Sequence, residues 1–509
     1  MPSVVSASSG APPQSRRHAG RALLLVASLS LASLGLLFWW IQALVPIASW
    51  QISLLLAGLL ALNLAPFCVE LAARTFDPFD PKYIFLGYFF LIFTFHSLCR
   101  ITLGIGTNPA LATLAPSDDL RVRALSAMLI GLAAFVSGCY LPVGRFLGHL
   151  APKLPLLKRR RGHLAAWTGI GAGLLAFWLL MRSAGGIGAF LSNLGSWRTT
   201  GVLAGVGYLT FPITLVLPAS CLLLLLQHLP VSPRRLTWTS AATLLLYGAS
   251  LAPVFLLGFR GNLLPAILQF FAAWHYGRRR LRVVSVGLMA AGLLLLLSVY
   301  SVIRSAAGGE EHQENALATA VLFRVPGLDT VERVVWRMDR GEPDRGLTPG
   351  LTEAATILVP RALWPGKPEP ASLAFADIFF YDFFLGRGDP LDGVKSGVSP
   401  TLVAELLWIG GLPFVAFGAL ALGTLSTAIN TWRQRAPHHP LHIFVAAIFM
   451  GWFAIFVEAP QNTLNTFVML ATFFLGLALI LTLRLARRIP AATSLVSVAP
   501  AAEGGAAPQ

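Results

Sequence analysis

The chain has 509 residues, of which 56% are hydrophobic and 12% are charged, and its formal net charge is +16. Its mean hydropathy is +0.71. A soluble domain carries about 25% charged residues, so half that fraction leaves too little polar surface to cover a globule in water. The composition therefore excludes an ordinary soluble domain and favours a protein that lies in a lipid bilayer.

Long apolar runs alternate with short polar connections along the chain. Runs such as 22–45 and 283–303 are long enough to cross roughly 30 Å of hydrocarbon at about 1.5 Å per residue. Because a lipid core offers no water to unpaired backbone groups, these runs should be α-helices. We predict an all-α polytopic membrane protein with about twelve spans, at residues 22–45, 49–69, 82–100, 124–143, 163–182, 203–227, 236–258, 261–276, 283–303, 401–429, 441–457 and 463–483.

The basic residues fall mainly in alternate connections between these spans. Arg16 and Arg17 precede the first span, residues 158–161 are all basic and precede the fifth, and residues 278–280 follow the eighth. Cytoplasmic connections are enriched in Lys and Arg, so both termini are predicted to be cytoplasmic. The positive charge is thereby assigned to topology and to anionic lipid headgroups, and not to nucleic acid.

The predicted spans divide the chain into five parts. Residues 1–20 form a cytoplasmic N-terminus whose composition predicts disorder. Spans one to nine occupy residues 21–304, and a large outer loop follows over residues 305–400. Spans ten to twelve occupy residues 401–484, and residues 485–509 form a cytoplasmic tail.

The outer loop differs from the rest of the chain in its charge. Residues 305–400 hold 14 of the chain's 22 acidic residues and only 9 Lys or Arg. A stretch this long and polar cannot lie in lipid, so by the predicted topology it faces outward. This outer loop is therefore the part of the chain where chemistry is expected.

Short helices are predicted within this loop. Asp329 and Glu332 have the spacing of a capping box, and apolar residues then recur at helical spacing. Thr348 followed by Pro349 predicts a capped second helix. The aromatic stretch 371–384 predicts a third, which lies either on the membrane surface or against the other loop helices.

Arg260 stands between Gly258 and Gly261 in the tight outer connection of spans seven and eight. A cation at this depth is unfavourable unless it is paired or hydrated, which makes it a functional candidate. The glycines permit a tight turn and close approach of a ligand, and free N–H groups at the start of span eight favour an anion. We predict an anion site; the alternative is an arginine that reaches lipid headgroups.

A second candidate segment is Pro-Arg-Ala-Leu-Trp-Pro-Gly-Lys-Pro at residues 360–368. Its three prolines make it stiff and hold Arg361 and Lys367 in fixed relation. Two cations on a rigid loop suit a phosphate group, with the arginine supplying a bidentate fork. The alternative is a proline-rich turn with solvated charges.

A third candidate is Glu405, about one turn inside the tenth span, which Pro400 opens. A carboxylate at this depth is unfavourable unless it pairs with a cation or takes part in chemistry. It is therefore either the partner of an arginine or a general base, and both alternatives stay open. Arg304 closes span nine on the same face, and His312 is the only histidine of the loop.

Three motifs in this order resemble those of the Wzy-type oligosaccharide repeat-unit polymerases. They are the Phe-Arg-Gly turn at 259–261, the proline-rich stretch 360–368, and Ser-Pro-Thr followed by Glu405 and a Gly-Gly pair within 399–411. The long outer loop before the tenth span is also similar. The resemblance covers mainly residues 258–411, and the first half of the chain matches only as hydrophobic spans.

The resemblance implies a membrane glycosyltransferase of the bacterial inner membrane with a periplasmic loop. Such enzymes transfer a growing glycan from one undecaprenyl pyrophosphate to the repeat unit on another, making O-antigen, capsule or exopolysaccharide. It implies no cofactor and no metal, and a chain-length regulator and a repeat-unit flippase as partners.

The same resemblance assigns roles to this chain's residues. Arg260, Arg361 and Lys367 are expected to bind the pyrophosphate, with Gly258, Gly261 and Arg304 in support. By the chemistry of such a transfer, Arg260 would stabilise the leaving group and Glu405 would be the general base, with His312 as the second choice. A single direct displacement would invert the anomeric centre.

Two other functions are compatible with the same topology. An O-antigen ligase has a similar architecture and the same donor, but ligases usually carry a histidine motif in the outer loop, and this loop has only His312. A transporter or flippase for lipid-linked sugars would place ionisable residues near the membrane midplane, whereas here they gather at the outer face. The sequence thus favours the polymerase.

Overall fold

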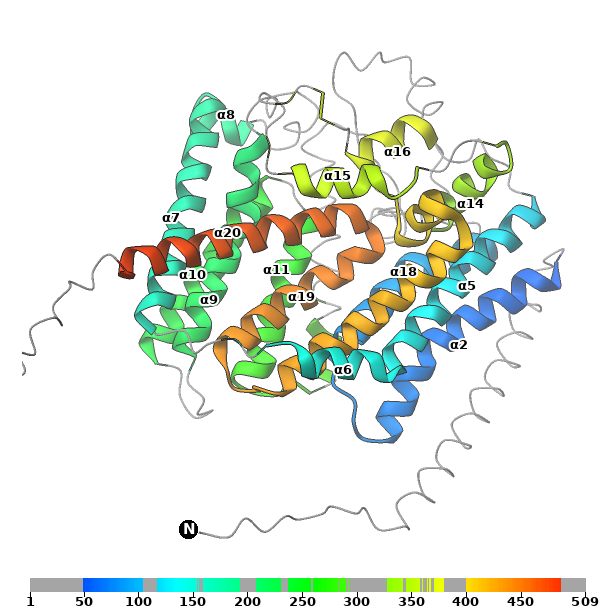
Figure 1. Cartoon of the computed structure of the whole chain (residues 1–509), viewed down its shortest axis with the longest axis horizontal. Coiled ribbons are helices and arrows are strands. Elements are labelled where there is room, and N and C mark those ends of the chain that lie inside the picture. Colours follow the sequence, from blue (N-terminus) through cyan, green and yellow to red (C-terminus); the bar gives the residue numbers. More distant parts are fainter. Residues whose placement is uncertain are drawn as a thin grey trace, which may run out of the picture.

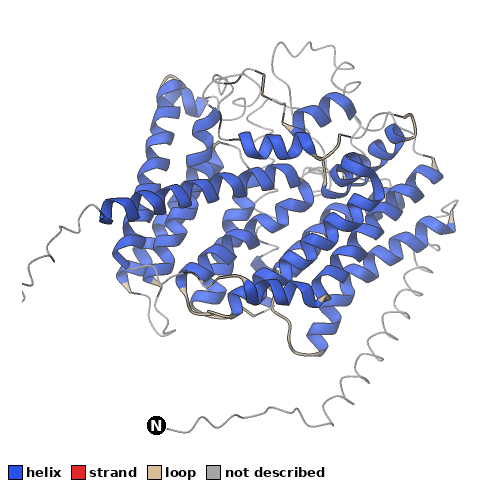
Figure 2. Cartoon of the chain, in the orientation of Figure 1, coloured by secondary structure: helices blue, strands red, loops and turns tan. Residues whose placement is uncertain are grey.

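The computed structural model describes residues 49–103, 117–152, 154, 159–192, 207–229, 237–257, 260–282, 284–289, 292, 327–341, 345–357, 359, 364, 366, 367, 370–379 and 400–486. All the regular elements in this part of the chain are helical, and none of it is β-strand (Figure 2). The predicted all-α class is therefore confirmed for these residues.

The helices run back and forth through one bundle (Figure 1). In chain order they are α2 (Trp50–Ala72), α3 (Pro81–Phe89), the π-helix η1 (Phe90–Phe95), α4 (His96–Leu103), α5 (Asp118–Tyr140), α6 (Pro142–Leu150), α7 (Arg159–Ser183), α8 (Ile187–Ser192), the short 3₁₀-helix η2 (Gly207–Leu209), the π-helix η3 (Pro212–Val216), α9 (Leu217–His228), α10 (Trp238–Leu256), α11 (Arg260–Gly277), α14 (Gly327–Met338), α15 (Thr348–Thr356), α16 (Ala371–Phe379), α18 (Leu402–Gln434), α19 (Pro440–Glu458) and α20 (Pro460–Ala486).

Seven helical runs among the described residues are long and apolar enough to cross a membrane: α2, the continuous run from α3 to α4, α5, α7, α10, α18 and α19. The run Pro212–His228 is apolar but shorter, and helices α11 and α20 coincide with the predicted eighth and twelfth spans. The first predicted span lies outside the described residues and the ninth lies mostly outside them. The protein is thus membrane-embedded, while the number twelve stays a prediction.

Local capping explains where helices begin. The Ser117 hydroxyl accepts a hydrogen bond from the Leu120 N–H at 3.3 Å, so α5 begins at Asp118, six residues before the predicted start of this span. Acidic residues in a first turn also interact favourably with the helix dipole. At α3 the Asp80 carboxylate accepts from the Lys82 N–H at 3.1 Å, and Pro81 occupies the first turn.

Helices α5 and α18 pack with their backbones in close contact. A Cβ added to Gly138 would overlap the carbonyl oxygen of Leu420, and one added to Gly423 would overlap that of Phe135. Small residues permit this approach between membrane helices. The contact fixes the part of α18 that follows its break at Gly410 and Gly411.

Enlarging one of these glycines should therefore destabilise the protein. We expect Gly423→Ala to lower the free energy of unfolding by about 1–3 kcal/mol, the usual effect of overpacking. Gly171→Ala on α7 is the matched control, because a Cβ there meets no atom within 4 Å. Thermal unfolding of the purified proteins in detergent measures the difference, and equal midpoints for the two variants would refute the close contact.

The apolar interior of the described residues has two large clusters joined by α19 and a smaller one that includes Leu180 and Ile213. One cluster includes side chains of α2, α3, α5, α14 and α18, and Phe453 of α19 belongs to it. The other lies mainly among α7, α9, α10, α11 and α20, and includes the neighbouring Trp452. Nearly the whole of α19 is buried between them, so this helix is the central element of the bundle.

Helix α14 lies within the bundle, although it comes from the predicted outer loop. Leu328, Val331 and Val334 are fully buried, and Gly327 sits directly against the carbonyl of Ile92. The predicted helix is confirmed, but it starts at Gly327. Asp329 is therefore in the first turn and is not the cap that we predicted.

The other two loop helices lie with α14 at one end of the bundle (Figure 1). Helix α15 begins at Thr348, and Leu347 is in the capping position, one residue before the predicted cap. In α16, Phe375 is fully buried and packs on Trp408 with ring centroids 5.5 Å apart. Residues 380–384 of the aromatic stretch lie outside the described residues. Phe375 thus favours a helix packed on protein over one lying on the membrane surface.

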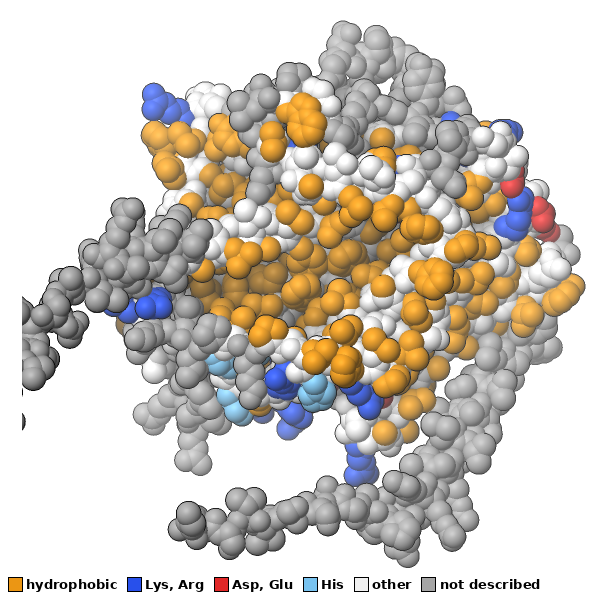
Figure 3. Space-filling model, viewed as in Figure 1, with side chains coloured by type: hydrophobic (Ala, Val, Ile, Leu, Met, Phe, Trp, Pro, Cys, Tyr) orange, Lys and Arg blue, Asp and Glu red, His pale blue; other side chains and the backbone are white. Residues whose placement is uncertain are grey.

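The opposite end of the bundle is closed by polar contacts. Arg435 donates to the carbonyl oxygens of Gly148, His149 and Ala151 at 2.6–3.1 Å, which satisfies the last carbonyls of α6. Asn430 donates to Asp80 at 2.5 Å. Lys, Arg and His side chains gather along the lower edge of the described surface, below a broad apolar band (Figure 3). The described surface in this view thus has a basic edge below an apolar band, which suits a membrane boundary.

Candidate functional site

Glu405 lies in the first turn of α18, at the end of the bundle covered by the loop helices. Thr401 precedes the helix with extended backbone, and its carbonyl accepts the Glu405 N–H at 2.8 Å. The Glu405 side chain is 3% exposed. A carboxylate so buried needs a charged or hydrogen-bonding partner.

Arg345 is that partner. It lies in the connection between α14 and α15, where its own N–H donates to the Trp408 carbonyl at 2.8 Å and its guanidinium lies 5.1 Å from the Trp408 ring centroid. One guanidinium nitrogen contacts Glu405 and the other contacts Glu353, each at 3.4 Å. The Arg345 side chain is only 6% exposed. A single arginine therefore bridges two buried carboxylates.

Helix α20 completes the cluster from the far end of the sequence. The Asn465 amide donates to Glu353 at 2.7 Å, and the Gln461 N–H donates to Glu405 at 3.3 Å. The Gln461 side chain donates to the carbonyl of Gly350 on α15 at 2.9 Å. The cluster thus connects the outer loop to α18 and α20.

The two carboxylates are not held equally. Glu353 accepts from Asn465 at 2.7 Å and from the Ala371 N–H at 3.0 Å, in addition to Arg345. The hydrogen bonds of Glu405 are longer, at 3.3 and 3.4 Å. Since shorter contacts hold a group more firmly, Glu405 is the carboxylate more able to exchange a partner.

The described part of the cluster has one guanidinium and two carboxylates, which leaves a formal charge of −1 when both acids are ionised. An excess negative charge opposes the binding of a pyrophosphate. It favours groups that donate hydrogen bonds, such as sugar hydroxyls. The charge of the cluster is therefore better suited to a hydroxyl group than to a phosphate group.

Removing the arginine should leave two buried charges without compensation. We expect Arg345→Met to lower the free energy of unfolding by about 3–5 kcal/mol. Adding Glu353→Gln and Glu405→Gln to that variant should restore much of the loss, because the uncompensated charges are gone. Thermal unfolding in detergent measures both effects.

Arg123→Met is the matched control for this prediction. Arg123 pairs with Asp339 at 2.6 Å, but both side chains are more than 40% exposed, and pairs of that kind contribute about 1 kcal/mol or less. An Arg345→Met variant as stable as Arg123→Met would refute the buried pairing.

A second charged cluster anchors α14 beside this site. Arg100 of α4 contacts both Asp329 and Glu332, the latter at 2.8 Å, and Arg121 lies 4.0 Å from Glu332. Burial raises the pKa of Glu332 to about 7, although Arg100 opposes this shift. Burial also raises the pKa of Asp329. The carboxylates predicted to form a capping box therefore bind a distant arginine.

The raised pKa of Glu332 makes stability depend on pH. Between its ordinary pKa of 4.5 and about 7, the folded protein holds a proton that the unfolded chain releases. The free energy of unfolding therefore falls as the pH rises through this window, by up to about 3 kcal/mol. Glu332→Gln should flatten the profile of melting temperature against pH, whereas Asp119→Asn, whose side chain is 76% exposed, should leave it unchanged. A slope that survives Glu332→Gln would assign the effect to another group.

The predicted phosphate-binding residues are only partly described. Helix α11 begins at Arg260 and includes Gly261, as predicted for the eighth span, but the Arg260 side chain lies outside the described residues. Gly258, Arg304, Arg361 and His312 also lie outside them. Their roles stay predictions.

Lys367 lies on the described side of the proline-rich stretch. Its ammonium donates to the carbonyl oxygens of Ile357 at 3.3 Å and Val359 at 3.0 Å. These contacts hold the loop after α15 against the stretch and give the lysine a structural role. Its role as a phosphate ligand stays a prediction.

Sequence reasoning did not find the partners of Glu405. Arg345 is one of nine basic residues in the loop. The local feature that sets it apart in the sequence is the following glycine, Gly346, which has a positive φ of 71°. Glu353 and Asn465 sit in ordinary helical segments. Only their convergence in space distinguishes them.

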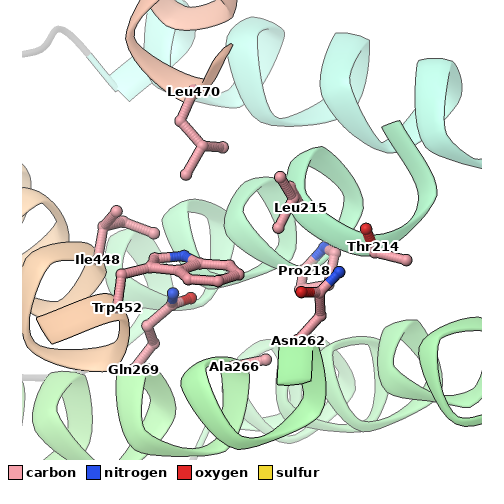
Figure 4. A pocket seen from close by; sticks show the side chains of 9 residues that line it. All are labelled: Thr214, Leu215, Pro218, Asn262, Ala266, Gln269, Ile448, Trp452 and Leu470. Atoms are coloured by element: carbon pink, nitrogen blue, oxygen red, sulfur yellow. The ribbon is translucent and has the colours of Figure 1, made fainter. Parts of the chain in front are cut away.

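A small polar cavity lies deeper in the bundle between α9, α11, α19 and α20 (Figure 4). Thr214, Asn262, Gln269 and Trp452 contribute its polar groups, and its volume is about 10 Å³. That is room for roughly one water molecule. It is too small for a sugar, which leaves the carboxylate cluster as the better candidate for chemistry.

No protein-family model, curated protein or solved structure matches this chain. Its class rests on the fold and the site: an all-helical, membrane-embedded protein with a buried arginine–carboxylate cluster beneath its loop helices.

Proposed function

We propose that this protein is a membrane glycosyltransferase. It polymerises oligosaccharide repeat units linked to undecaprenyl pyrophosphate at the periplasmic face of the bacterial inner membrane. The observation that carries the proposal is the carboxylate pair of Glu353 and Glu405, bridged by Arg345 under the loop helices. The resemblance of the motifs around Arg260, residues 360–368 and Glu405 supports the same reaction.

The proposed reaction uses an acidic part of the site to remove a proton and a basic part to stabilise the leaving group. Glu405 accepts the proton of the acceptor hydroxyl. At the same time the oxygen of that hydroxyl forms a bond to the anomeric carbon of the donor. The bond from that carbon to the phosphate oxygen breaks, and its electron pair leaves with the undecaprenyl pyrophosphate. Arg260, Arg361 and Lys367 stabilise the charge that builds on this leaving group.

Arg345 is a positioning residue in this proposal. Its contact with Glu405 holds the carboxylate in a fixed orientation, which a general base requires. The firmer bonds of Glu353 hold Arg345 in place. The pairing of Glu405 and its role as a base are thus compatible, because one oxygen contacts Arg345 and the other contacts, among the described residues, the Gln461 N–H.

A transporter or flippase for lipid-linked sugars is the second candidate, and one observation favours it. Helix α18 is interrupted at Gly410 and Gly411, where Gly411 has a φ of 71°. Transporters often bind substrate at broken helices. The break follows Glu405 by only five residues, so it lies near the outer end of the bundle and also fits a helix shaped around a polymerase site.

Deletion of the gene tests the proposal through the surface polysaccharide. The deleted strain should display single repeat units, and the wild-type gene should restore the long-chain ladder on a gel. Glu405→Gln and Arg260→Ala should slow polymerisation roughly a hundredfold or more and leave mostly single units. Blotting checks that each variant is present in the membrane.

Asp119→Asn and Arg182→Ala are the matched controls, since both change charged residues outside the proposed site. They should restore the ladder fully. A ladder that survives the deletion would exclude polymerisation of that polysaccharide. Loss of even single units from the cell surface would favour the transporter.

A further inference from the structure

Helix α6 follows α5 at a corner of the chain. The backbone at Leu141 is extended, with a φ of −64° and a ψ of 141°, and Pro142 occupies the first turn of α6. The part of α5 from residue 124 to residue 140 contains no charged side chain and covers about 25 Å at about 1.5 Å per residue. Since a hydrocarbon core is about 30 Å thick, α5 nearly crosses it and α6 starts close to its boundary.

Helix α6 is too short to cross a membrane by itself, because it has nine residues and covers only about 13 Å. Its carboxyl end is closed by the protein. Arg435 donates to three carbonyl oxygens between residues 148 and 151 at 2.6–3.1 Å, and the Trp432 indole donates to the Pro152 carbonyl at 2.9 Å. Backbone carbonyls that have partners in the protein need no water, so this helix can lie partly in lipid.

One face of α6 packs on α18. A Cβ added to Gly144 would lie 2.7 Å from the carbonyl oxygen of Thr424, and one added to Gly148 would lie 2.6 Å from that of Ala428. The two glycines are four residues apart and therefore share a face of the helix. Every other residue of α6 is exposed, so the rest of its surface faces away from the bundle.

The exposed surface of α6 divides into an apolar and a basic side. Steps of about 100° per residue place four apolar residues together, and their side chains are 45–64% exposed: Val143, Phe146, Leu147 and Leu150. The same steps place Arg145 and His149 together on a different side. A helix with one apolar and one basic side, too short to span, is typical of a segment that lies along the membrane interface.

The surroundings of α6 indicate what covers its apolar side. Helix α6 lies at the lower end of the bundle in Figure 1, where the apolar band of Figure 3 meets the edge of Lys, Arg and His side chains. Tyr140 ends α5 at this level, is 46% exposed, and has the Lys82 ammonium 5.4 Å from its ring centroid. Tyrosine and tryptophan are enriched at membrane–water interfaces, and Tyr140 and Trp432 both adjoin α6. The apolar side of α6 is thus continuous with the membrane-facing band and is bordered by cations, which fits phospholipid better than a second protein.

We infer that α6 is an interfacial helix that binds the anionic lipid surface at the basic end of the bundle. Its apolar side contacts the beginning of the acyl chains, and Arg145 and His149 contact headgroup phosphates. Because α6 is also bound to α18 through its glycines and Arg435, it fixes the depth of the carboxyl end of α18 in the membrane. This lipid contact does not depend on the reaction proposed above.

Photocrosslinking of the full-length protein in vesicles of phosphatidylethanolamine and phosphatidylglycerol tests the inference. Benzoylphenylalanine replaces Phe146 or, in a separate variant, Leu150, and mass spectrometry identifies the adducts. Both positions should form lipid adducts about as often as Leu245, which is 74% exposed on the apolar helix α10. Asp119, which is 76% exposed in the first turn of α5, is the water-facing control. Adducts as rare as those at Asp119, or crosslinks to a second copy of the chain, would overturn the inference.

Replacement of the basic side tests the headgroup contact. In Arg145→Gln the ratio of phosphatidylglycerol to phosphatidylethanolamine adducts at position 150 should fall about fivefold, the change expected for one arginine near an anionic membrane surface. Arg182→Gln is the matched control, because Arg182 is also exposed but lies at the end of α7 next to α8, at the opposite end of the bundle (Figure 1). It should leave the ratio unchanged. Equal ratios in the two variants would overturn the inference.

Discussion

The bridge from Arg345 to Glu353 and Glu405 is the contact on which the outer half of this protein depends. It joins the connection after α14 to α15 and to the start of α18, and α20 reaches the same group through Gln461 and Asn465. Charges in a water-poor interior must find partners inside the protein. That requirement fixes how the loop helices sit on the bundle, and it places a carboxylate at the one spot where they meet.

Contacts with α5, α6 and the start of α3 fix the position of α18 in the bundle. Glycines on α5, α6 and α18 let the backbones touch, and Gly138 and Gly423 are the closest points. At the far end, Arg435 and Asn430 tie α18 to α6 and to the start of α3. Contacts of this kind tolerate little change, because an added methyl group meets backbone atoms that cannot move aside. The first turn of α18 precedes its break at Gly410 and Gly411, so Glu405 is held in place by Arg345 and Gln461.

The proposed reaction assigns its acidic and basic functions to different parts of the chain. The described acidic cluster carries excess negative charge and suits a hydroxyl, whereas the cations proposed for the pyrophosphate come from the Arg260 turn and the stretch 360–368. Such a separation is useful in glycosyl transfer, since the nucleophile must lose a proton while the leaving group gains negative charge.

Composition and hydropathy by themselves determined the helical, membrane-embedded class, because lipid leaves the backbone no other regular structure. Most span boundaries fell within a few residues of the observed helices, and Glu405 could be singled out, because a carboxylate inside an apolar run is conspicuous. Only the tertiary structure decided what it pairs with. Arg345, Glu353 and Asn465 are ordinary residues of polar or helical segments, and their partners lie up to 112 residues away. The same holds for Asp329 and Glu332: local spacing indicated a capping box, but a buried arginine from α4 competes better for their carboxylates than the backbone does, since an ion pair compensates a buried charge and a single N–H does so only in part.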